Sequence, residues 1–214
     1  MCGRFTLTVD DVAALARAWA AEVDAAVAAA WRPRYNVAPG DPHLLLRNGA
    51  PGRRLERARF GIAGARGRLH LNARIETAPA LPAFREAWRE RRCAVPADGF
   101  FEWEGPEGAR RPVWFHRPSG RPLLLAGLFE EREGALAFAI LTTGAAGPVR
   151  PIHDRMPVLL PEEGLGAWLA GTGPAPATDA ELIGRPVSPR VNSVEHDDPA
   201  CLEPPAPERQ LKLL

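Results

Sequence analysis

The stretch Cys93-Ala94-Val95-Pro96-Ala97-Asp98-Gly99-Phe100-Phe101-Glu102-Trp103 decides the fold class of this chain. We expect strands over residues 93–95 and 99–103, because both runs are short and apolar and are bounded by proline or glycine. In the second strand, alternation places Glu102 on one face and Phe101 and Trp103 on the other. A carboxyl group buried among aromatic rings would have a raised pKa, which suits a general acid or base. An exposed acid on a half-buried strand is the commoner alternative.

Most of the chain after this stretch is also typical of strands. They are expected at residues 112–116, 122–130, 135–143 and 156–160, with a last strand at 187–194. Residues 161–170 suggest a short helix with proline at its start, and residues 172–178 a loop. The segment from Asp197 onward is rich in proline and charge and is expected to be an irregular or mobile tail.

The part before this stretch mixes helix and strand. Thr8 followed by Asp11 resembles an N-cap that opens an Ala-rich helix over residues 9–30, which Arg32-Pro33 ends. Further expected elements are a turn-rich loop at 35–40, strands at 43–47 and 56–62, a loop or strand end at 72–77, and a short helix at 82–92. The prediction is an α+β fold: a single domain, residues 2–196, on a curved, mostly antiparallel, barrel-like sheet with peripheral helices, then the tail 197–214.

Composition agrees with one soluble domain. The 214 residues are 46% hydrophobic and 25% charged, enough to bury a core. No apolar run is long enough to span a membrane and no signal peptide is recognised, so we expect a cytoplasmic protein. Cys2, Cys93 and Cys201 are widely spaced and suggest neither a disulfide framework nor a metal site. Cys93 and Cys201 are interpreted as small buried hydrophobic residues.

The net charge of +1 hides an asymmetry along the chain. Residues 32–92 carry 14 arginines against 5 acids, whereas residues 93–214 carry 11 basic residues against 17 acids. A basic segment of this kind can line a groove for a polyanion such as nucleic acid. The alternative is a coding preference for arginine, because Lys212 is the one lysine in the chain.

Cys2 has unusual chemistry if Met1 is removed. The new terminus would carry an α-amine and a thiol on adjacent carbons, and the amine of an ordinary terminus has a pKa near ~7.7–8.0. Such a 1,2-aminothiol condenses with an aldehyde to an imine and then closes a five-membered thiazolidine ring. We expect positive charge such as that of Arg4 to lower the pKa of the thiol. The same terminus could act as an amidase-type nucleophile, or Cys2 could be accidental.

Three more residues are candidates on their own chemistry. His153, between Ile152 and Asp154, could move protons near neutral pH. Asn72 can hydrogen-bond an oxyanion or a sugar hydroxyl, and Arg74 can hold a phosphate. The alternatives without a functional role are a structural histidine, a turn-forming asparagine and a solvated arginine.

Taken together, several segments resemble the SOS response-associated peptidase (SRAP) family, whose bacterial and animal members protect abasic sites. The resemblance spans residues 2–194 and rests on six segments in the family's order: Met1-Cys2-Gly3-Arg4-Phe5, Tyr35-Asn36-Val37-Ala38-Pro39-Gly40, Asn72-Ala73-Arg74-Ile75-Glu76-Thr77, Val95-Pro96-Ala97-Asp98-Gly99-Phe100-Phe101-Glu102-Trp103, Ile152-His153-Asp154-Arg155-Met156-Pro157 and Val191-Asn192-Ser193-Val194. Residues 2–196 would then form an SRAP domain.

The resemblance implies an enzyme that crosslinks Cys2 to the aldehyde of abasic sites in single-stranded DNA, after Met1 has been removed either by the protein itself or by an aminopeptidase. Glu102 and His153 would handle protons, and Asn72 would hold the Cys2 terminus and the sugar. It implies a monomer that needs no cofactor or metal, is not bound to a membrane, and is associated with the nucleoid when on DNA. The DNA-binding residues would be Arg4, Pro39, Phe60, Arg74, Trp103, Thr142 and Arg155.

Two departures from the family pattern stand out. Where the family commonly has a tryptophan that wedges against a base, this chain has Phe60, which would stack with less area. The segment between Arg59 and Asn72 is also short. The alternative functions are a peptidase that acts on other proteins through its N-terminal cysteine, and a non-catalytic single-stranded DNA binder.

Overall fold

The computed structural model describes residues 2–172 and 181–207. Its centre is a ring of five strands in which each is hydrogen-bonded to the next, in the order β13-β12-β9-β4-β5. The ring closes where β5 pairs in parallel with β13, with Phe60 opposite Phe138. The other pairings in the ring are antiparallel, so the expected barrel-like, mostly antiparallel core is confirmed. The ring strands are β4 (Pro42–Asn48), β5 (Arg53–Phe60), β9 (Arg92–Ala97), β12 (Leu123–Arg132) and β13 (Ala135–Gly144).

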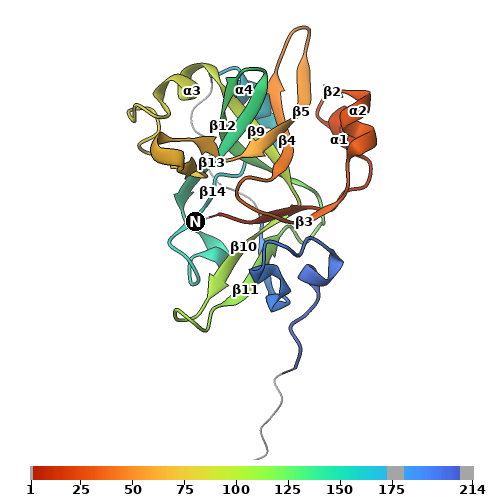
Figure 1. Ribbon diagram of the computed structural model, residues 1–214, viewed down its shortest axis with the longest axis vertical. Helices are drawn as coiled ribbons and strands as arrows, with labels where there is room; N and C mark the ends of the chain where they lie inside the picture. The colour runs from red at the N-terminus through yellow and green to blue at the C-terminus, as the bar shows by residue number, and fades with distance from the viewer. Residues whose placement is uncertain (1, 173–180, 208–214) are drawn as a thin grey trace, which may run out of the picture.

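A second sheet packs below the ring in the view of Figure 1 and has the order β15-β11-β10-β1-β3. The turn at Asp98 joins ring strand β9 to β10 of this sheet, so the stretch quoted first links the two sheets. The strands of the second sheet are β1 (Phe5–Leu7), β3 (Arg34–Val37), β10 (Gly99–Glu104), β11 (Arg111–His116) and β15 (Ile183–Pro186).

Alternation along the ring strands produces two hydrophobic cores. On β12, Leu124 and Ala126 face a core that is covered by helices, whereas Leu123 and Leu125 face the core shared with the second sheet. The covering helices are α1 (Val12–Ala18), α3 (Arg85–Glu90) and α4 (Leu165–Leu169). In Figure 1, α3 and α4 lie above the ring and α1 lies to its right.

The remaining elements are short and lie around these sheets. They are β2 (Ala21–Val23), α2 (Ala25–Ala30), β6 (Ile62–Ala63), β7 (Leu69–His70), β8 (Asn72–Arg74), β14 (Arg155–Pro157), and the 3-10 turns η1 (Ala65–Gly67), η2 (Gly147–Val149), η3 (Glu162–Gly164), η4 (Pro189–Asn192) and η5 (Pro199–Leu202). Among the described residues, no helix is both long and apolar enough to cross a membrane.

The expected long helix over residues 9–30 is wrong. The chain instead forms α1, β2 and α2, because Ala20 adopts a positive φ of 51° and β2 then pairs in parallel with β5. Asp11 rather than Thr8 caps α1, by accepting a hydrogen bond from the amide of Ala14 at 2.9 Å. A second aspartate, Asp24, caps α2 in the same way.

Two expectations near the C-terminus also need correction. The last strand is Ile183–Pro186, and half of the expected strand 187–194 is the 3-10 turn η4. The expected tail is not irregular at its start, because Asp197 accepts hydrogen bonds from the amides of Tyr35 and Asn36 and Cys201 is fully buried. Residues 197–203 therefore pack as part of the domain. The expected loop 172–178 lies, apart from residue 172, outside the described residues.

Gly99 provides a test of the junction between β1, β10 and β11. A Cβ atom at this position would lie 2.2 Å from Trp114 Nε1 and 2.8 Å from the backbone oxygen of Phe115. Gly99→Ala should therefore lower the free energy of unfolding by about 1–3 kcal/mol, measured by urea denaturation. Gly144→Ala is the matched control, because nothing lies within 4 Å of a Cβ there. Equal stability of the two variants would contradict this packing.

Candidate active site at the N-terminus

Cys2 is held in place by the pairing of β1 with β10. Phe5 lies opposite Phe100, and the amide of Phe101 donates to the backbone oxygen of Arg4 at 3.0 Å. Continuing this antiparallel register toward the N-terminus brings Gly3 opposite Glu102. The sheet therefore places Cys2 beside the carboxylate of Glu102, the residue that the alternation along β10 indicated as a candidate.

Cys2 and Glu102 are both buried and influence each other electrostatically. Cys2 is 0% exposed and Glu102 is 3% exposed. Burial raises the pKa of the Cys2 thiol far above its ordinary value, and the negative charge of Glu102 raises it further. Burial also raises the pKa of Glu102, while nearby positive charge, including that of His153, acts in the opposite direction. The expected lowering of the thiol pKa by Arg4 is wrong, because desolvation is the larger effect.

Arg4 connects three segments of the resemblance instead of facing solvent. Its Nη1 donates to Asn36 Oδ1 and to the backbone oxygen of Val191, both at 2.8 Å. Asn36 Nδ2 in turn donates to the backbone oxygens of Ser193 at 2.9 Å and His196 at 2.7 Å. Much of the guanidinium of Arg4 is therefore engaged within the protein, although the residue remains partly exposed.

Asn72, at the start of β8, and His153, in the loop before β14, both lie next to residues of the apolar core that contains Cys2. Asn72 begins β8, where it lies opposite Ile140 of β13, and Ile140 packs in the same apolar core as Cys2. Ile152, next to His153, packs against that core as well. The Oδ1 atom of Asn72 is buried and has no hydrogen-bond partner in the described structure. It is therefore a ready acceptor for an amine or a hydroxyl group.

His153 Nδ1 lies between a donor and an acceptor. The backbone amide of Arg155 donates to it at 2.9 Å, and Asp154 Oδ1 lies 3.0 Å away. The neutral ring can accept from the amide and carry its proton on Nε2, whereas the protonated ring can donate from Nδ1 to Asp154. Both protonation states thus have a partner, as a proton-transfer group requires.

Arg155 forms hydrogen bonds with both Thr142 and Glu76. Arg155 Nη1 and Nη2 each donate to one carboxylate oxygen of Glu76 at 2.8 Å, and Nη2 also donates to the backbone oxygen of Thr142 at 2.6 Å. Thr142 is fully buried, so its side chain has no surface to offer a ligand in this structure. Sequence analysis did not single out the role of Glu76, because an Arg-x-Glu spacing does not by itself indicate a partner 79 residues away.

The expected stacking of Phe60 on a base disagrees with its position. Phe60 is 0% exposed, and its ring stacks on Phe138 and packs edge-on against Phe5. It lies at the closure of the strand ring, where β5 meets β13. Phe60 is therefore a core residue here, and its ring has no free face for DNA.

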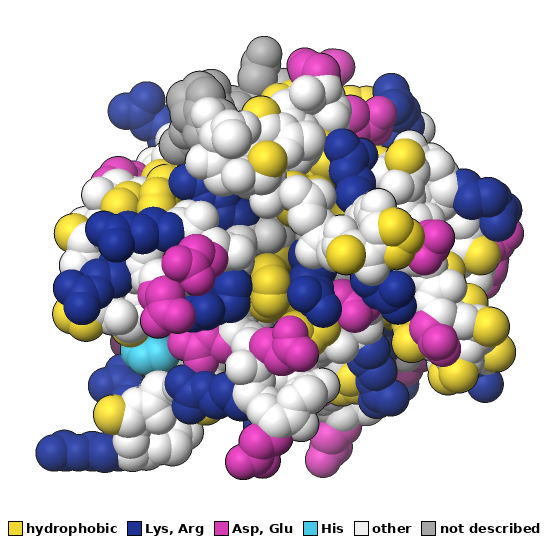
Figure 2. Space-filling model, turned by 90° about the horizontal axis from the view of Figure 1, so that it is seen from above, with side chains coloured by type: hydrophobic (Ala, Val, Ile, Leu, Met, Phe, Trp, Pro, Cys, Tyr) yellow, Lys and Arg dark blue, Asp and Glu magenta, His cyan; other side chains and the backbone are white. Residues whose placement is uncertain are grey.

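Other expected DNA-binding residues do lie on the surface. Arg74 and Pro39 are exposed, and Trp103 is partly exposed with its indole nitrogen donating to Asn192 Oδ1 at 2.7 Å. On the face seen in Figure 2, arginines and acids are interspersed instead of forming one basic patch. The charge asymmetry of the sequence is thus not visible as a continuous basic surface on that face.

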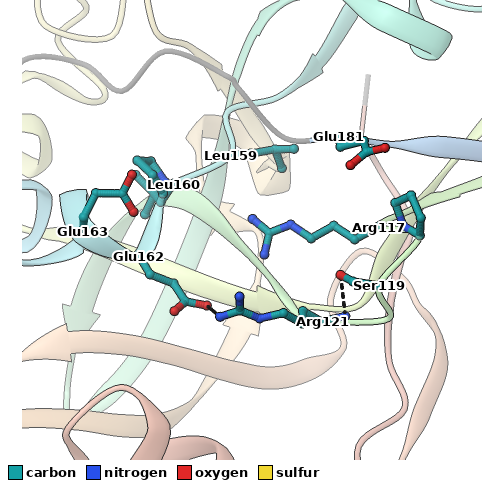
Figure 3. Close-up of a pocket in the computed structure, with 10 residues that line it drawn as sticks. Arg117, Ser119, Arg121, Leu159, Leu160, Glu162, Glu163 and Glu181 are labelled. Atoms are coloured by element: carbon teal, nitrogen blue, oxygen red, sulfur yellow. Dashed lines mark hydrogen bonds and ion pairs between the residues drawn. The ribbon is translucent and has the colours of Figure 1, made fainter.

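Two cavities are lined by residues other than Cys2. One of about 500 Å³ is lined by residues that include Trp31 and His43, and the other, of about 360 Å³, is shown in Figure 3 with Arg117 between acidic side chains. Within residues 2–172 and 181–207, no group of three or more potential ligands could hold a metal ion.

Fold and site together define a mixed α/β domain that presents a cysteine from its extreme N-terminus to a buried carboxylate. The chain belongs to the SRAP family: the family model for SOS response associated peptidases matches residues 1–194. It is 31% identical to the abasic site processing protein YedK of Escherichia coli (strain K12), covering 95% of this chain and 100% of YedK. It is equally similar, at 31%, to the abasic site processing protein YoqW of Bacillus subtilis (strain 168), with coverage of 95% and 99%.

A solved structure confirms the fold independently. A crystal structure of a protein from Bacteroides thetaiotaomicron superposes with a TM-score of 0.80, covering 95% of this chain and 99% of that one at 18% identity. At this identity the likeness establishes the fold alone.

The raised pKa of Glu102 predicts a stability difference that depends on pH. Because burial makes ionisation of Glu102 less favourable in the folded than in the unfolded chain, Glu102→Gln should increase the free energy of unfolding at pH 7. The pKa of this group is higher in the folded than in the unfolded chain. Its contribution to stability is thus fully present below the ordinary carboxyl value of 4.5 and is lost as the pH rises through the raised pKa. The advantage of Gln should shrink at acidic pH in denaturation curves, and a less stable Gln variant at pH 7 would contradict it.

Proposed function

We propose that this protein bonds covalently through Cys2 to abasic sites in single-stranded DNA and thereby shields them. The observation that carries the proposal is the register of β1 and β10, which sets a cysteine at the chain terminus next to the buried carboxyl group of Glu102. The names of the two bacterial relatives support the choice of abasic sites as substrate. Because the terminal cysteine must carry a free amine, the proposal includes removal of Met1.

The proposed reaction is redox-neutral and needs no further reagent. Hydrolysis of the Met1–Cys2 peptide bond consumes one water and releases methionine. The amine of Cys2 then attacks the sugar aldehyde, and loss of one water gives an imine. Addition of the Cys2 sulfur to the imine carbon closes the thiazolidine ring, while the thiol proton ends on the nitrogen. Proximity favours the last step because amine and thiol share one residue.

Glu102 and His153 would move the protons in this sequence. A thiol with a raised pKa reacts poorly until a base takes its proton, and a carboxylate whose own pKa is raised is a better base than an ordinary one. Glu102 would therefore accept the thiol proton and return it to the nitrogen. His153 in its protonated form, with Nδ1 donating to Asp154, would give its Nε2 proton to the ring oxygen of the closed sugar while the anomeric hydroxyl loses its proton to water, which breaks the ring C–O bond and releases the aldehyde.

The remaining residues would position the terminus and the strand. The free Oδ1 of Asn72 would accept a hydrogen bond from the Cys2 amine or a sugar hydroxyl. Arg74 would contact a phosphate, and Pro39 and Trp103 would contact sugars and bases from the surface. Arg4 would act mainly by holding the N-terminal segment, because its hydrogen bonds run to Asn36 and Val191.

Replacing the thiol tests the chemistry directly. Cys2→Ala should abolish the adduct with abasic single-stranded DNA that survives denaturing gels, while binding of intact DNA is largely retained. Intact-mass measurement before and after incubation reports both the loss of Met1 and the adduct. Cys201→Ala is the matched control, since it removes another buried thiol without touching the terminus. A denaturant-resistant adduct on Cys2→Ala would rule out the thiazolidine mechanism.

Arg74 tests the contact with the DNA backbone. Arg74→Ala should weaken binding of single-stranded DNA and reduce the slope of log affinity against log salt by about 0.7, as expected for the loss of one phosphate contact. Arg89→Ala, which removes the same charge from the exposed face of α3, is the control. An equal loss of affinity in both variants would mean that net charge alone matters.

A further inference from the structure

Glu76 occupies the position in which a phosphate would bind. Its two carboxylate oxygens each accept a hydrogen bond from one terminal nitrogen of Arg155, at 2.8 Å each. This paired geometry is the one by which arginine holds a phosphate group through two of its oxygens. The hydrogen bonds from Arg155 lower the pKa of Glu76, so the carboxylate is ionised and anionic like the group it would replace.

The two partners differ in how firmly they are held. Only 13% of the Arg155 side chain is exposed, and its Nη2 also donates to the backbone oxygen of Thr142 at 2.6 Å. The Glu76 side chain is 49% exposed and follows β8 in a turn, where its carboxylate is held by Arg155 and by a hydrogen bond from its own backbone amide, with no contact to a second element. Loss of the ion pair would thus leave the guanidinium in place while Glu76 moves into solvent.

The surroundings suit an incoming anion once Glu76 has left. Arg74 lies two residues before Glu76, is exposed, and contributes electrostatically to the lowered pKa of Glu76. His153 lies two residues before Arg155, and its Nδ1 accepts a hydrogen bond from the backbone amide of Arg155. A phosphate on Arg155 would therefore lie near the surface cation Arg74, in the segment that carries the proposed proton-transfer group.

We propose that Glu76 is an internal competitor for phosphate: it occupies Arg155 in the free protein and is displaced by a backbone phosphate of the bound strand. The inference rests on the proposed function and adds a residue that limits DNA affinity. A half-exposed ion pair is weak enough to be exchanged for a phosphate contact. While Glu76 occupies Arg155, a ligand without an anionic group at this position cannot replace it. Binding without a correctly placed phosphate is therefore disfavoured.

The test is the affinity of Glu76→Gln for a fluorescent single-stranded oligonucleotide without abasic sites, which keeps crosslinking out of the measurement. The variant should bind about 3- to 10-fold more tightly at low salt, because the competitor's charge is gone. Its affinity should also depend more steeply on salt, since Arg155 now gains its full contact on binding. Weaker binding would mean that Glu76 holds Arg155 in place for DNA, which would overturn the proposal.

Two further variants separate competition from a change in net charge. Glu162→Gln is the matched control, because Glu162 forms an ion pair of the same length with Arg121, at 2.8 Å, in the cavity of Figure 3. It should leave affinity nearly unchanged; a gain equal to that of Glu76→Gln would overturn the inference. In an Arg155→Gln background, Glu76→Gln should no longer tighten binding, and a full gain there would also overturn it.

Failure of the inference can be told apart from failure of the proposed function. If the parent protein forms a Cys2-dependent adduct with abasic DNA and Glu76→Gln does not tighten binding, only the role of Glu76 is wrong. If the parent protein neither binds single-stranded DNA nor forms the adduct, the proposed function itself is wrong, and the role of Glu76 falls with it.

Discussion

The antiparallel pairing of β1 with β10 is the constraint on which the site depends. It joins the first residues of the chain to the strand that carries Glu102, and it does so from inside a sheet, with β3 on the other side of β1. The side chain of Asp98 strengthens this junction by accepting hydrogen bonds from Thr6 and Thr8. A terminus that would otherwise fray is thereby fixed beside a buried acid.

Burial makes both ionisable groups of this site, Cys2 and Glu102, harder to ionise, and this affects how they can react. A desolvated thiol holds its proton, and a desolvated carboxyl group does the same. A thiol in this state is a poor nucleophile until a base takes its proton, so burial makes any reaction at Cys2 depend on a nearby base.

The segments that suggested the family from sequence are the segments that meet in space. Arg4 and Asn36 join the N-terminus to Val191, Arg155 joins the segment of His153 to that of Asn72, and β10 joins Glu102 to Cys2. Most strand positions were predictable because apolar alternation and glycine or proline turns are local signals, whereas the strand order was not predicted. Two contacts between distant parts of the sequence were not predictable either: the burial of Phe60 follows from the closure of the ring between β5 and β13, and the partner of Arg155 follows from the pairing of both β8 and β14 with β13. The break at Ala20 was missed because alanine favours a helix unless tertiary pairing, here of β2 with β5, overrides it.

The shortness of the link between Cys2 and β1 has a consequence for how a substrate can be approached. Only Gly3 and Arg4 separate the cysteine from the first strand residue, and the backbone oxygen of Arg4 is already bonded to β10. At about 3.3 Å per residue, the sulfur has a tether of less than ~10 Å. Because this link is short and anchored, Cys2 cannot move far from the domain to reach a substrate. Any molecule that reacts with Cys2 must therefore bind next to it within the domain. A purification tag fused ahead of Cys2 would occupy the same position.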